Sequence, residues 1–283
     1  MTTQSVLGGG VAVITGAAGG IGEGLARVAA ELGMRLVLAD IAEERLRHVA
    51  DALAAKGSEV LAVTTDVRDA AALDRLADAA HERFGAVRLL INNAGIEALG
   101  FTWELSAEQW NRVIDINILG VIHGARAFAG RMIAAGDPGF IVNVASIGGL
   151  AMMPVQTPYI LSKHAVLSFS ECLYLEMEQV KAPIRVSAVL PGPVATRIFE
   201  DAPGGSNPDS IAFHRAAMNA ALSEQGMTPL DAARLILDQV AEGKFWVSPH
   251  PEMMQASASR RAAHLAALAT PMLTAEGRSL LEG

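Results

Sequence analysis

The sequence predicts an α/β protein organised around a doubly wound parallel β-sheet. Short β-branched runs alternate with amphipathic helical patterns along most of the chain, the order expected for parallel strands joined by helices. Each run ends in glycine or in small polar residues, and in doubly wound sheets the carboxyl ends of the strands line the crevice that binds ligands. We therefore expect one ligand site at one edge of the sheet.

The composition limits the partners of this chain. Its 283 residues are 51% hydrophobic and 18% charged, which is enough for a large buried core. The formal net charge of −8 argues against a nucleic-acid backbone or an anionic membrane surface as the main partner and favours a small molecule. No Pro- or Ser-rich linker interrupts the strand and helix pattern, so we expect a single domain, 1–283, with a substrate lid around 195–227 and a helical tail around 253–283.

Further features indicate a soluble, cytoplasmic protein without a metal site. The amino terminus has no positive charge before an apolar segment, and the uncharged stretch 138–162 contains Asn143, paired glycines and prolines, so we expect neither a secretory signal nor a membrane span. The seven histidines show no paired ligand spacing. The single cysteine, Cys172, lies in an apolar helical run and is expected to be a buried thiol in a reducing compartment.

The first predicted strand, 11–15, breaks into a glycine turn. Gly16, Gly20 and Gly22 have the spacing Gly-x-x-x-Gly-x-Gly, and a helical pattern follows as far as Leu32. Glycines let the backbone approach a pyrophosphate, and the free amides at the start of a helix attract its negative charge. The turn predicts a dinucleotide site, although any tight strand-to-helix turn favours glycine.

The next strand, 35–39, ends in Asp40. This residue follows Gly20 by about 20 positions, the offset at which a carboxylate binds the adenosine ribose hydroxyls of NAD. A carboxylate repels the 2′-phosphate of NADP, and neither Ile41 nor Ala42 supplies a cation for it, so the sequence favours NAD. Asp40 can also cap the helix predicted at 43–53, and the two roles are compatible.

Two more strands end in polar residues. The strand at 59–64 leads to Asp66 and Val67 and to a helix at 69–84, and the strand at 88–91 ends in Asn92-Asn93-Ala94-Gly95. A long helix follows, with Asn117 in its interior. Asn is a poor residue for the middle of a helix, which suggests a special role; a buried amide bonded to a neighbouring carbonyl is the ordinary explanation.

The segment 143–177 is predicted as a strand, a glycine- and methionine-rich loop and a helix, and it carries residues for proton transfer. Tyr159 and Lys163 are four residues apart, so they lie one turn apart on one helix face. A nearby ammonium lowers the pKa of a phenol from its usual value of about 10, so Tyr159 can donate a proton to a carbonyl or accept one from an alcohol. Ser146 can bond the same oxygen, although each residue alone has an ordinary structural explanation.

The rest of the chain continues the alternating pattern. A strand at 185–190 ends in a Pro- and Gly-containing segment, and the region 198–227 is rich in Gly, Pro, Asn and Ser with scattered large apolar residues. That composition is typical of a mobile substrate lid or of a simple surface loop. A helix at 229–241, a strand at 245–247 and a helical tail at 253–268 are predicted to complete the chain.

Together these motifs resemble the short-chain dehydrogenase/reductase family. The resemblance covers roughly residues 10–250 and rests on Thr15, Gly16, Gly20, Ile21, Gly22, Asp40, Asp66, Asn92, Asn93, Ala94, Gly95, Asn117, Ser146, Tyr159, Lys163, Pro191 and Gly192. It implies a Rossmann-like fold with about seven strands, hydride transfer between a nicotinamide and a carbinol or carbonyl carbon, and a homodimer or homotetramer. One departure is Ile160-Leu161, where the family usually has small residues.

The resemblance also implies a role for each site residue. Tyr159 is expected to be the general acid/base, Ser146 to polarise the substrate oxygen, and Lys163 to bind the nicotinamide ribose and lower the pKa of the tyrosine. Asn117 is expected to hold a water in a proton relay. Asp66 and Val67 are expected at the adenine, Asn93 along the cofactor backbone, and Val194 and Thr196 at the carboxamide; the other expected cofactor-binding residues are Gly16, Gly20, Ile21, Gly22, Asp40, Ala94, Gly95, Pro191 and Gly192.

The expected substrate pocket is apolar and rich in methionine. Besides Ser146 and Tyr159, its predicted lining is Ile147, Met152, Met153, Val155, Phe199 and Phe213. We therefore expect NAD-dependent interconversion of a hydrophobic secondary alcohol and its ketone, such as an aromatic, terpenoid or steroid-like compound. A non-catalytic NAD-binding sensor and a cofactor-retaining isomerase or dehydratase remain as alternatives.

Overall fold

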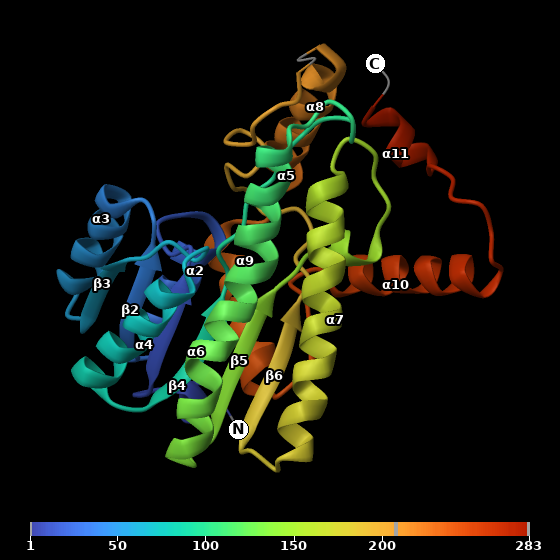
Figure 1. The fold of residues 1–283 in the computed structure, drawn as a ribbon. Helices are drawn as coiled ribbons and strands as arrows, with labels where there is room; N and C mark the ends of the chain where they lie inside the picture. Colours follow the sequence, from blue (N-terminus) through green and yellow to red (C-terminus); the bar gives the residue numbers. More distant parts are fainter. Residues whose placement is uncertain (1, 207–208, 282–283) are drawn as a thin grey trace.

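The computed structural model describes residues 2–206 and 209–281, and in this part of the chain seven parallel strands form one sheet (Figure 1). The strands are β1 (Val11–Thr15), β2 (Arg35–Asp40), β3 (Val60–Thr64), β4 (Val87–Asn92), β5 (Gly139–Val144), β6 (Ile184–Val189) and β7 (Trp246–Val247). Their order in the sheet is β3-β2-β1-β4-β5-β6-β7, so the winding reverses between β1 and β4. The predicted doubly wound, Rossmann-like sheet is confirmed.

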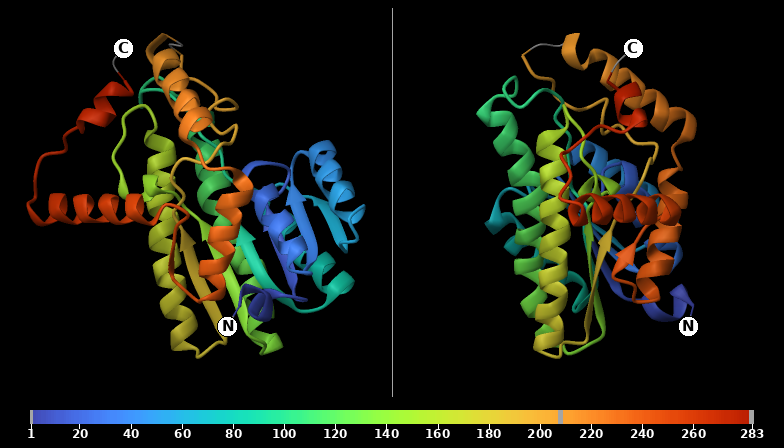
Figure 2. Two further views of the ribbon diagram at one scale, coloured as in Figure 1. Left: turned by 180° about the vertical axis from the view of Figure 1, so that it is seen from behind. Right: turned by 90° about the vertical axis from the view of Figure 1, so that its right-hand side faces the viewer.

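Helices cover both faces of this sheet (Figures 1 and 2). One face packs against α2 (Gly20–Glu31), α3 (Glu43–Ala54) and α9 (Pro229–Ala241), and the other against α4 (Ala70–Phe84), α6 (Gly120–Ala135) and α7 (Thr157–Gln179). Every residue of β1 is buried, since alternate side chains enter the two cores. This two-sided burial explains why the strands are near-continuous apolar runs in the sequence.

A single long helix spans α5 (Ala107–Ile114), a π-helical turn at Asp115–Leu119, and α6. Asn117 lies in the π-helical turn, where the wider winding is often associated with functional sites. In the described part of the chain, 107–135 is the one helical segment long and apolar enough to cross a membrane. It packs against α4, α7 and β4, so its apolar residues are those of a helix covering the sheet.

The region 198–227 differs from its prediction, because the helix α8 (Asp209–Gln225) occupies most of it. Alanine, the strongest helix former, is frequent in this helix, and the Gly, Pro and Ser residues that favoured a loop are concentrated before it. Residues 207–208 of the predicted lid and 282–283 of the predicted tail lie outside the described residues.

The carboxyl-terminal part runs out from the body and returns to it. The helix α10 (Pro251–Ala266) projects from the sheet, and the chain then turns back so that α11 (Ala275–Ser279) lies near α8 (Figures 1 and 2). A hydrogen bond of 2.9 Å joins His214 Nδ1 on α8 to the carbonyl of Leu280. The helix α11 lies within the predicted helical tail, 253–283, although the sequence did not predict the break between α10 and α11. The short helix α1 (Thr3–Leu7) was not predicted.

The prediction of a buried thiol is wrong, because Cys172 is exposed on α7. Leu161 and Leu175 on the same helix are also exposed. The helix is apolar around most of its circumference, so the apolar character of the neighbouring residues did not indicate which side is buried.

Candidate active site

The site lies where the carboxyl ends of the central strands meet. Ile14 of β1 pairs with Ile91 of β4, and Asn92 pairs with Asn143 of β5, so the segments that follow these three strands emerge side by side. They carry the glycine turn, the Asn93 segment and Ser146. This is the switch point of the sheet, the usual position of a ligand in a doubly wound fold.

The glycine turn fits a pyrophosphate. A Cβ on Gly22 would overlap the carbonyl oxygen of Gly16, so the turn requires glycine there, whereas a Cβ on Gly19 would meet no atom within 4 Å. No side chain caps the start of α2, which leaves its first amides free to bind an anion. Thr196 faces the turn, since a Cβ on Gly20 would lie 3.2 Å from Thr196 Cγ2.

Asn93 and Thr15 hold this turn against the end of β4. Asn93 Nδ2 donates to the carbonyl oxygens of Thr15 (2.9 Å) and Gly16 (3.1 Å). Thr15 Oγ1 accepts from the amides of Asn93 (3.0 Å) and Ala94 (3.2 Å). Asn93 therefore shapes the site, and its predicted contact with the cofactor backbone stays a prediction. The role of Thr15 was missed, although a threonine ending β1 before the glycines is a visible signal.

Asp40 lies beside the same turn at the end of β2. Its Oδ2 accepts from the amide of Ala18 (3.0 Å), and its Oδ1 accepts from the amide of Ala42 (2.9 Å). The carboxylate thus holds both the glycine turn and the segment that leads to α3. Its position beside the glycine turn fits the predicted ribose contact.

Asp66, after β3, is fixed by an ion pair with Arg68 at 2.6 Å. The hydrogen-bonded guanidinium of Arg68 lowers the pKa of Asp66 below its ordinary value, so this carboxyl is ionised at neutral pH. The carbonyl of the buried Val67 lies 3.1 Å from His123 Nδ1. The predicted contact of Asp66 and Val67 with adenine stays a prediction.

Ser146, Tyr159 and Lys163 come together next to this edge. Ser146 Oγ accepts from the amide of Gly148 at 3.0 Å and is hydrogen-bonded to the Tyr159 phenol. Lys163 Nζ donates to the carbonyl of Val144 at 3.0 Å and lies 5.4 Å from the centre of the Tyr159 ring. The predicted juxtaposition of hydroxyl, phenol and ammonium is therefore present.

Burial sets the protonation of this group. It raises the pKa of Tyr159 above its ordinary value, while the hydrogen bond from Ser146 opposes the rise. It also lowers the pKa of Lys163 from 10.5 to about 8. The expectation that Lys163 brings the tyrosine pKa below its ordinary value does not hold in the chain alone, because burial of the phenol and the charge of Glu97 both raise that pKa, and Lys163 is not among the groups that lower it.

Asn117 is fully buried and connects the long helix to two parts of the site. Its Oδ1 accepts from the amide of Ile96, and its Nδ2 donates to the carbonyl of Ile96, each at 2.9 Å. Nδ2 also donates to Ser162 Oγ at 3.0 Å. Both Nδ2 hydrogens are thus committed to protein partners. The structure gives Asn117 a positioning role, and the predicted water relay stays a prediction.

Glu97 is a residue that the sequence reasoning missed. It is 1% exposed, and its Oε1 accepts from the amide of Ala98 at 2.9 Å. A carboxylate inside the apolar run Ile96-Glu97-Ala98-Leu99, directly after Gly95, was the available signal.

The segment after β6 is bonded to the residue that follows Ser146 and to His250. The amide of Ile147 donates to the carbonyl of Pro191 at 3.0 Å, and the amide of Gly192 donates to His250 Nδ1 at 3.1 Å. Val194 pairs with Met227, which ties this segment to the residues that follow α8. Nothing in the sequence had indicated the part played by His250.

The predicted substrate lining is only partly brought together. Met152 and Met153 lie in the loop between Ser146 and Tyr159, and a Cβ on Gly277 of α11 would lie 3.8 Å from Met153 Cε. Val155 is buried nearby with a φ of 57°. Ile147 packs against the core cluster of Leu167, Ala188 and Leu190. Phe199 packs in a separate cluster with Leu99, Ile211 and Leu222, and Phe213 is 43% exposed.

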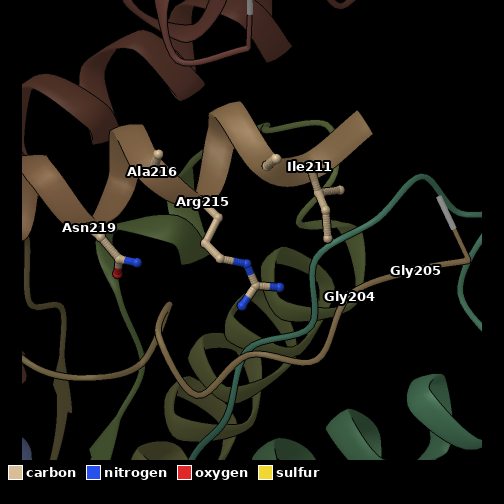
Figure 3. Close-up of a pocket in the computed structure, with 7 residues that line it drawn as sticks. Gly204, Gly205, Ile211, Arg215, Ala216 and Asn219 are labelled. Atoms are coloured by element: carbon tan, nitrogen blue, oxygen red, sulfur yellow. The ribbon is translucent and has the colours of Figure 1, made fainter. Parts of the chain in front are cut away.

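A cavity of about 620 Å³ lies under α8, away from these catalytic candidates. Figure 3 shows Arg215 reaching from α8 towards Gly204 and Gly205. Its guanidinium donates to the carbonyls of Phe199 (3.1 Å) and Ala202 (2.6 Å). Arg215 therefore ties α8 to the segment before it, and the cavity lies between these two parts of the chain.

A doubly wound sheet with a glycine turn at its switch point, and with serine, tyrosine and lysine at the same edge, defines a nucleotide-dependent oxidoreductase. A sequence model of the short chain dehydrogenase family matches residues 10–205. The chain belongs to this family, and the prediction of a dehydrogenase/reductase dependent on a nicotinamide dinucleotide is confirmed at that level.

Three relatives illustrate the similarity. The oxidoreductase UcpA of Salmonella typhimurium is 41% identical over 204 residues, covering 72% of this chain and 76% of the relative. The 1-deoxy-11-beta-hydroxypentalenate dehydrogenase of Streptomyces avermitilis is 37% identical over 187 residues, covering 65% and 68%. The crystal structure of a short chain dehydrogenase/reductase from Burkholderia phymatum in complex with NAD is 37% identical, with a TM-score of 0.90 and coverage of 95% and 98%.

Proposed function

We propose that this chain is an NAD-dependent dehydrogenase that interconverts a hydrophobic secondary alcohol and its ketone. The observation that carries the proposal is the convergence of Ser146, Tyr159 and Lys163 on the edge where the glycine turn and Asp40 lie. Residues for proton transfer and residues fit for a dinucleotide thus share one site. Similarity to a relative solved with NAD supports the choice of cofactor.

The chain's own residues account for the proton half of the reaction. The bound nicotinamide supplies the acceptor or donor of hydride. In alcohol oxidation, the carbinol O–H bond breaks and its proton goes to the Tyr159 oxygen; in ketone reduction, Tyr159 returns a proton to the carbonyl oxygen. Ser146 orients the same oxygen by hydrogen bonding. The positive charge of Lys163 stabilises the Tyr159 phenolate when no other anion balances that charge.

The preference for NAD rests on Asp40. Its carboxylate lies at the end of β2 next to the glycine turn, where the adenosine ribose of a bound dinucleotide belongs. An anion there binds ribose hydroxyls and repels a 2′-phosphate. Ile41, the next residue, is largely exposed and offers no positive charge for NADP.

The preference for a hydrophobic substrate rests on the loop between Ser146 and Tyr159. Met152 and Met153 supply apolar surface there beside the buried Val155, and α11 lies against Met153. Thioether side chains adapt to bulky apolar shapes. A relative named as the dehydrogenase of a hydroxypentalenate supports a substrate bearing a hydroxyl group. We further propose that 195–227 acts as a substrate lid within a single domain.

We also propose a cytoplasmic homodimer or homotetramer built on the face of α6 and α7. Leu161, Leu175 and Val180 are exposed on or just after α7, and Leu119 precedes α6 on the same side of the sheet. Exposed apolar side chains along packed helices are typical of an interface between subunits.

The test is NADH absorbance of the purified protein with a panel of hydrophobic secondary alcohols, run in parallel with NAD and NADP. Turnover with NAD is expected, and Tyr159→Phe should lower kcat/KM by about 10² to 10⁴ fold because the proton acceptor is lost. Tyr174→Phe is the matched control, since Tyr174 packs against Phe245 in the core. Full turnover by Tyr159→Phe would refute the mechanism, and turnover mainly with NADP would refute the role of Asp40.

The two alternatives give different results in the same assay. Tight binding of NAD with no turnover across the panel would favour a non-catalytic sensor. Conversion of a substrate with no net change in NADH would favour an isomerase or dehydratase that retains its cofactor.

A further inference from the structure

Glu97 is a buried carboxyl group that the proton chemistry above does not use. It lies two residues after Gly95, in the segment that follows β4, and only 1% of it is exposed. Its Oε1 accepts a hydrogen bond from Ala98, but Oε2 is buried and has no hydrogen-bond partner among the described residues. A buried oxygen without a partner costs about 1–3 kcal/mol, so its presence in the site requires a reason.

The segment that carries Glu97 passes beside the ammonium of Lys163. A Cβ on Gly95 would lie 3.4 Å from Lys163 Nζ and 3.5 Å from Asn117 Oδ1. Asn117 holds both backbone polar groups of Ile96, which fixes Glu97 relative to α7. No ion pair within 4.0 Å joins Glu97 to Lys163 in the described part of the chain, so the two groups interact through space rather than in direct contact.

Lys163 and Tyr159, both on α7, are the titratable groups that interact with Glu97, and the third element packed here contributes the neutral amide of Asn117. Burial raises the pKa of Glu97 well above its usual range, and Lys163 opposes this rise. An ionised Glu97 in turn raises the pKa of both Tyr159 and Lys163. The three groups therefore titrate as one coupled set.

The site holds one cation and two groups that can become anions. Lys163 is 4% exposed, so solvent screens its positive charge only weakly. One buried ammonium can balance one anion, and a second anion would remain uncompensated at a cost of several kcal/mol. An ionised Glu97 and an ionised Tyr159 are therefore mutually exclusive partners of Lys163.

We propose that Glu97 is a positioning residue that competes with the Tyr159 phenolate for the charge of Lys163 and thereby sets the pH at which Tyr159 changes from proton donor to proton acceptor. An ionised Glu97 keeps Tyr159 protonated, which favours ketone reduction. A protonated Glu97 leaves Lys163 to the phenolate, which favours alcohol oxidation. The catalytic consequence of this inference rests on the proposed function. The effect of Glu97 on the ionisation of Tyr159 does not, because it concerns the protein without cofactor or substrate.

The chain offers a direct probe, because it contains two tyrosines. In a Tyr174→Phe background, tyrosinate absorbance reports Tyr159 alone, with neither cofactor nor substrate present. Adding Glu97→Gln should raise the ratio of ionised to protonated Tyr159 about tenfold at a fixed alkaline pH at which circular dichroism shows the fold to be retained. Glu97→Leu, which also lacks the charge, should give the same direction.

Two controls separate this effect from a change in net charge or packing. Glu108→Gln removes the same charge from an exposed position on α5 and should leave the Tyr159 ratio unchanged. Glu97→Asp keeps the carboxyl group and should restore most of the wild-type ratio. An unchanged or lowered ratio in both Glu97→Gln and Glu97→Leu would overturn the proposal.

A second measurement links the inference to turnover. The pH midpoint of kcat/KM for alcohol oxidation should fall by about 1 unit in Glu97→Gln relative to the wild type and to Glu108→Gln. A shifted tyrosinate ratio without any turnover would leave the inference standing and refute the proposed function. Turnover with an unmoved tyrosinate ratio and pH midpoint would leave the function standing and refute the inference.

Discussion

Replacing Asn117 by alanine tests how strongly the site depends on one buried amide. The substitution removes three hydrogen bonds, to the amide and the carbonyl of Ile96 and to Ser162 Oγ. At roughly 1 kcal/mol for each bond lost, the free energy of unfolding should fall by about 3 kcal/mol. For a chain of this size that corresponds to a fall in Tm of about 6–12 °C.

Urea unfolding followed by circular dichroism measures this change. The matched control is Asn111→Ala, an exposed asparagine four residues before the π-helical turn begins at Asp115. Its effect should stay within about 0.5 kcal/mol. A loss below about 1 kcal/mol for Asn117→Ala would refute the reasoning. It would mean that the three bonds are replaced by water, or that they contribute no net stability.

Two further substitutions test the glycine turn and the buried ammonium. Gly22→Ala should weaken NADH binding at least about tenfold in a fluorescence titration, because its Cβ would overlap the Gly16 carbonyl, whereas Gly19→Ala has free space and should bind normally; equal affinities would contradict the proposed fit. The pKa of Lys163 falls from 10.5 to about 8 on folding, so between these values the unfolded chain binds more protons and the free energy of unfolding should rise with pH. In Lys163→Met, this increase in the free energy of unfolding between the two pKa values should be smaller by about 3 kcal/mol than in the wild type. Urea unfolding at pH 8 and at pH 10.5 measures the difference. The same pH dependence in both proteins would contradict the prediction.

The fold could be predicted from the sequence because its signals are local. Strands buried on both faces appear as short apolar runs, and each was placed within a few residues of its observed bounds, as for β2 at Arg35–Asp40. The helix α9, predicted at 229–241, has those same bounds. The helix α8 was missed because the Gly, Pro and Ser residues around 203–208 dominated the composition of its region.

Burial depends on tertiary packing, so the sequence predicted it less well. Cys172 has apolar neighbours along α7 and is nevertheless exposed, while Glu97 is charged and nevertheless buried. Neither outcome follows from spacing along one segment. The backbone beside Glu97 is held by Asn117, 20 residues further along the chain, through two hydrogen bonds to Ile96.

The position of Tyr159 depends on the same contacts. Asn117 Nδ2 donates to Ser162 Oγ, and Ser162 Oγ donates to the backbone carbonyl of Tyr159 at 2.7 Å. The π-helical turn that carries Asn117 therefore holds the first turn of α7 and the Glu97 segment with one side chain. Since Tyr159 and Glu97 are fixed through a shared residue, their separation from Lys163 cannot change independently. This coupling is what allows a carboxyl group without a direct bond to either partner to set the proton affinity of the tyrosine.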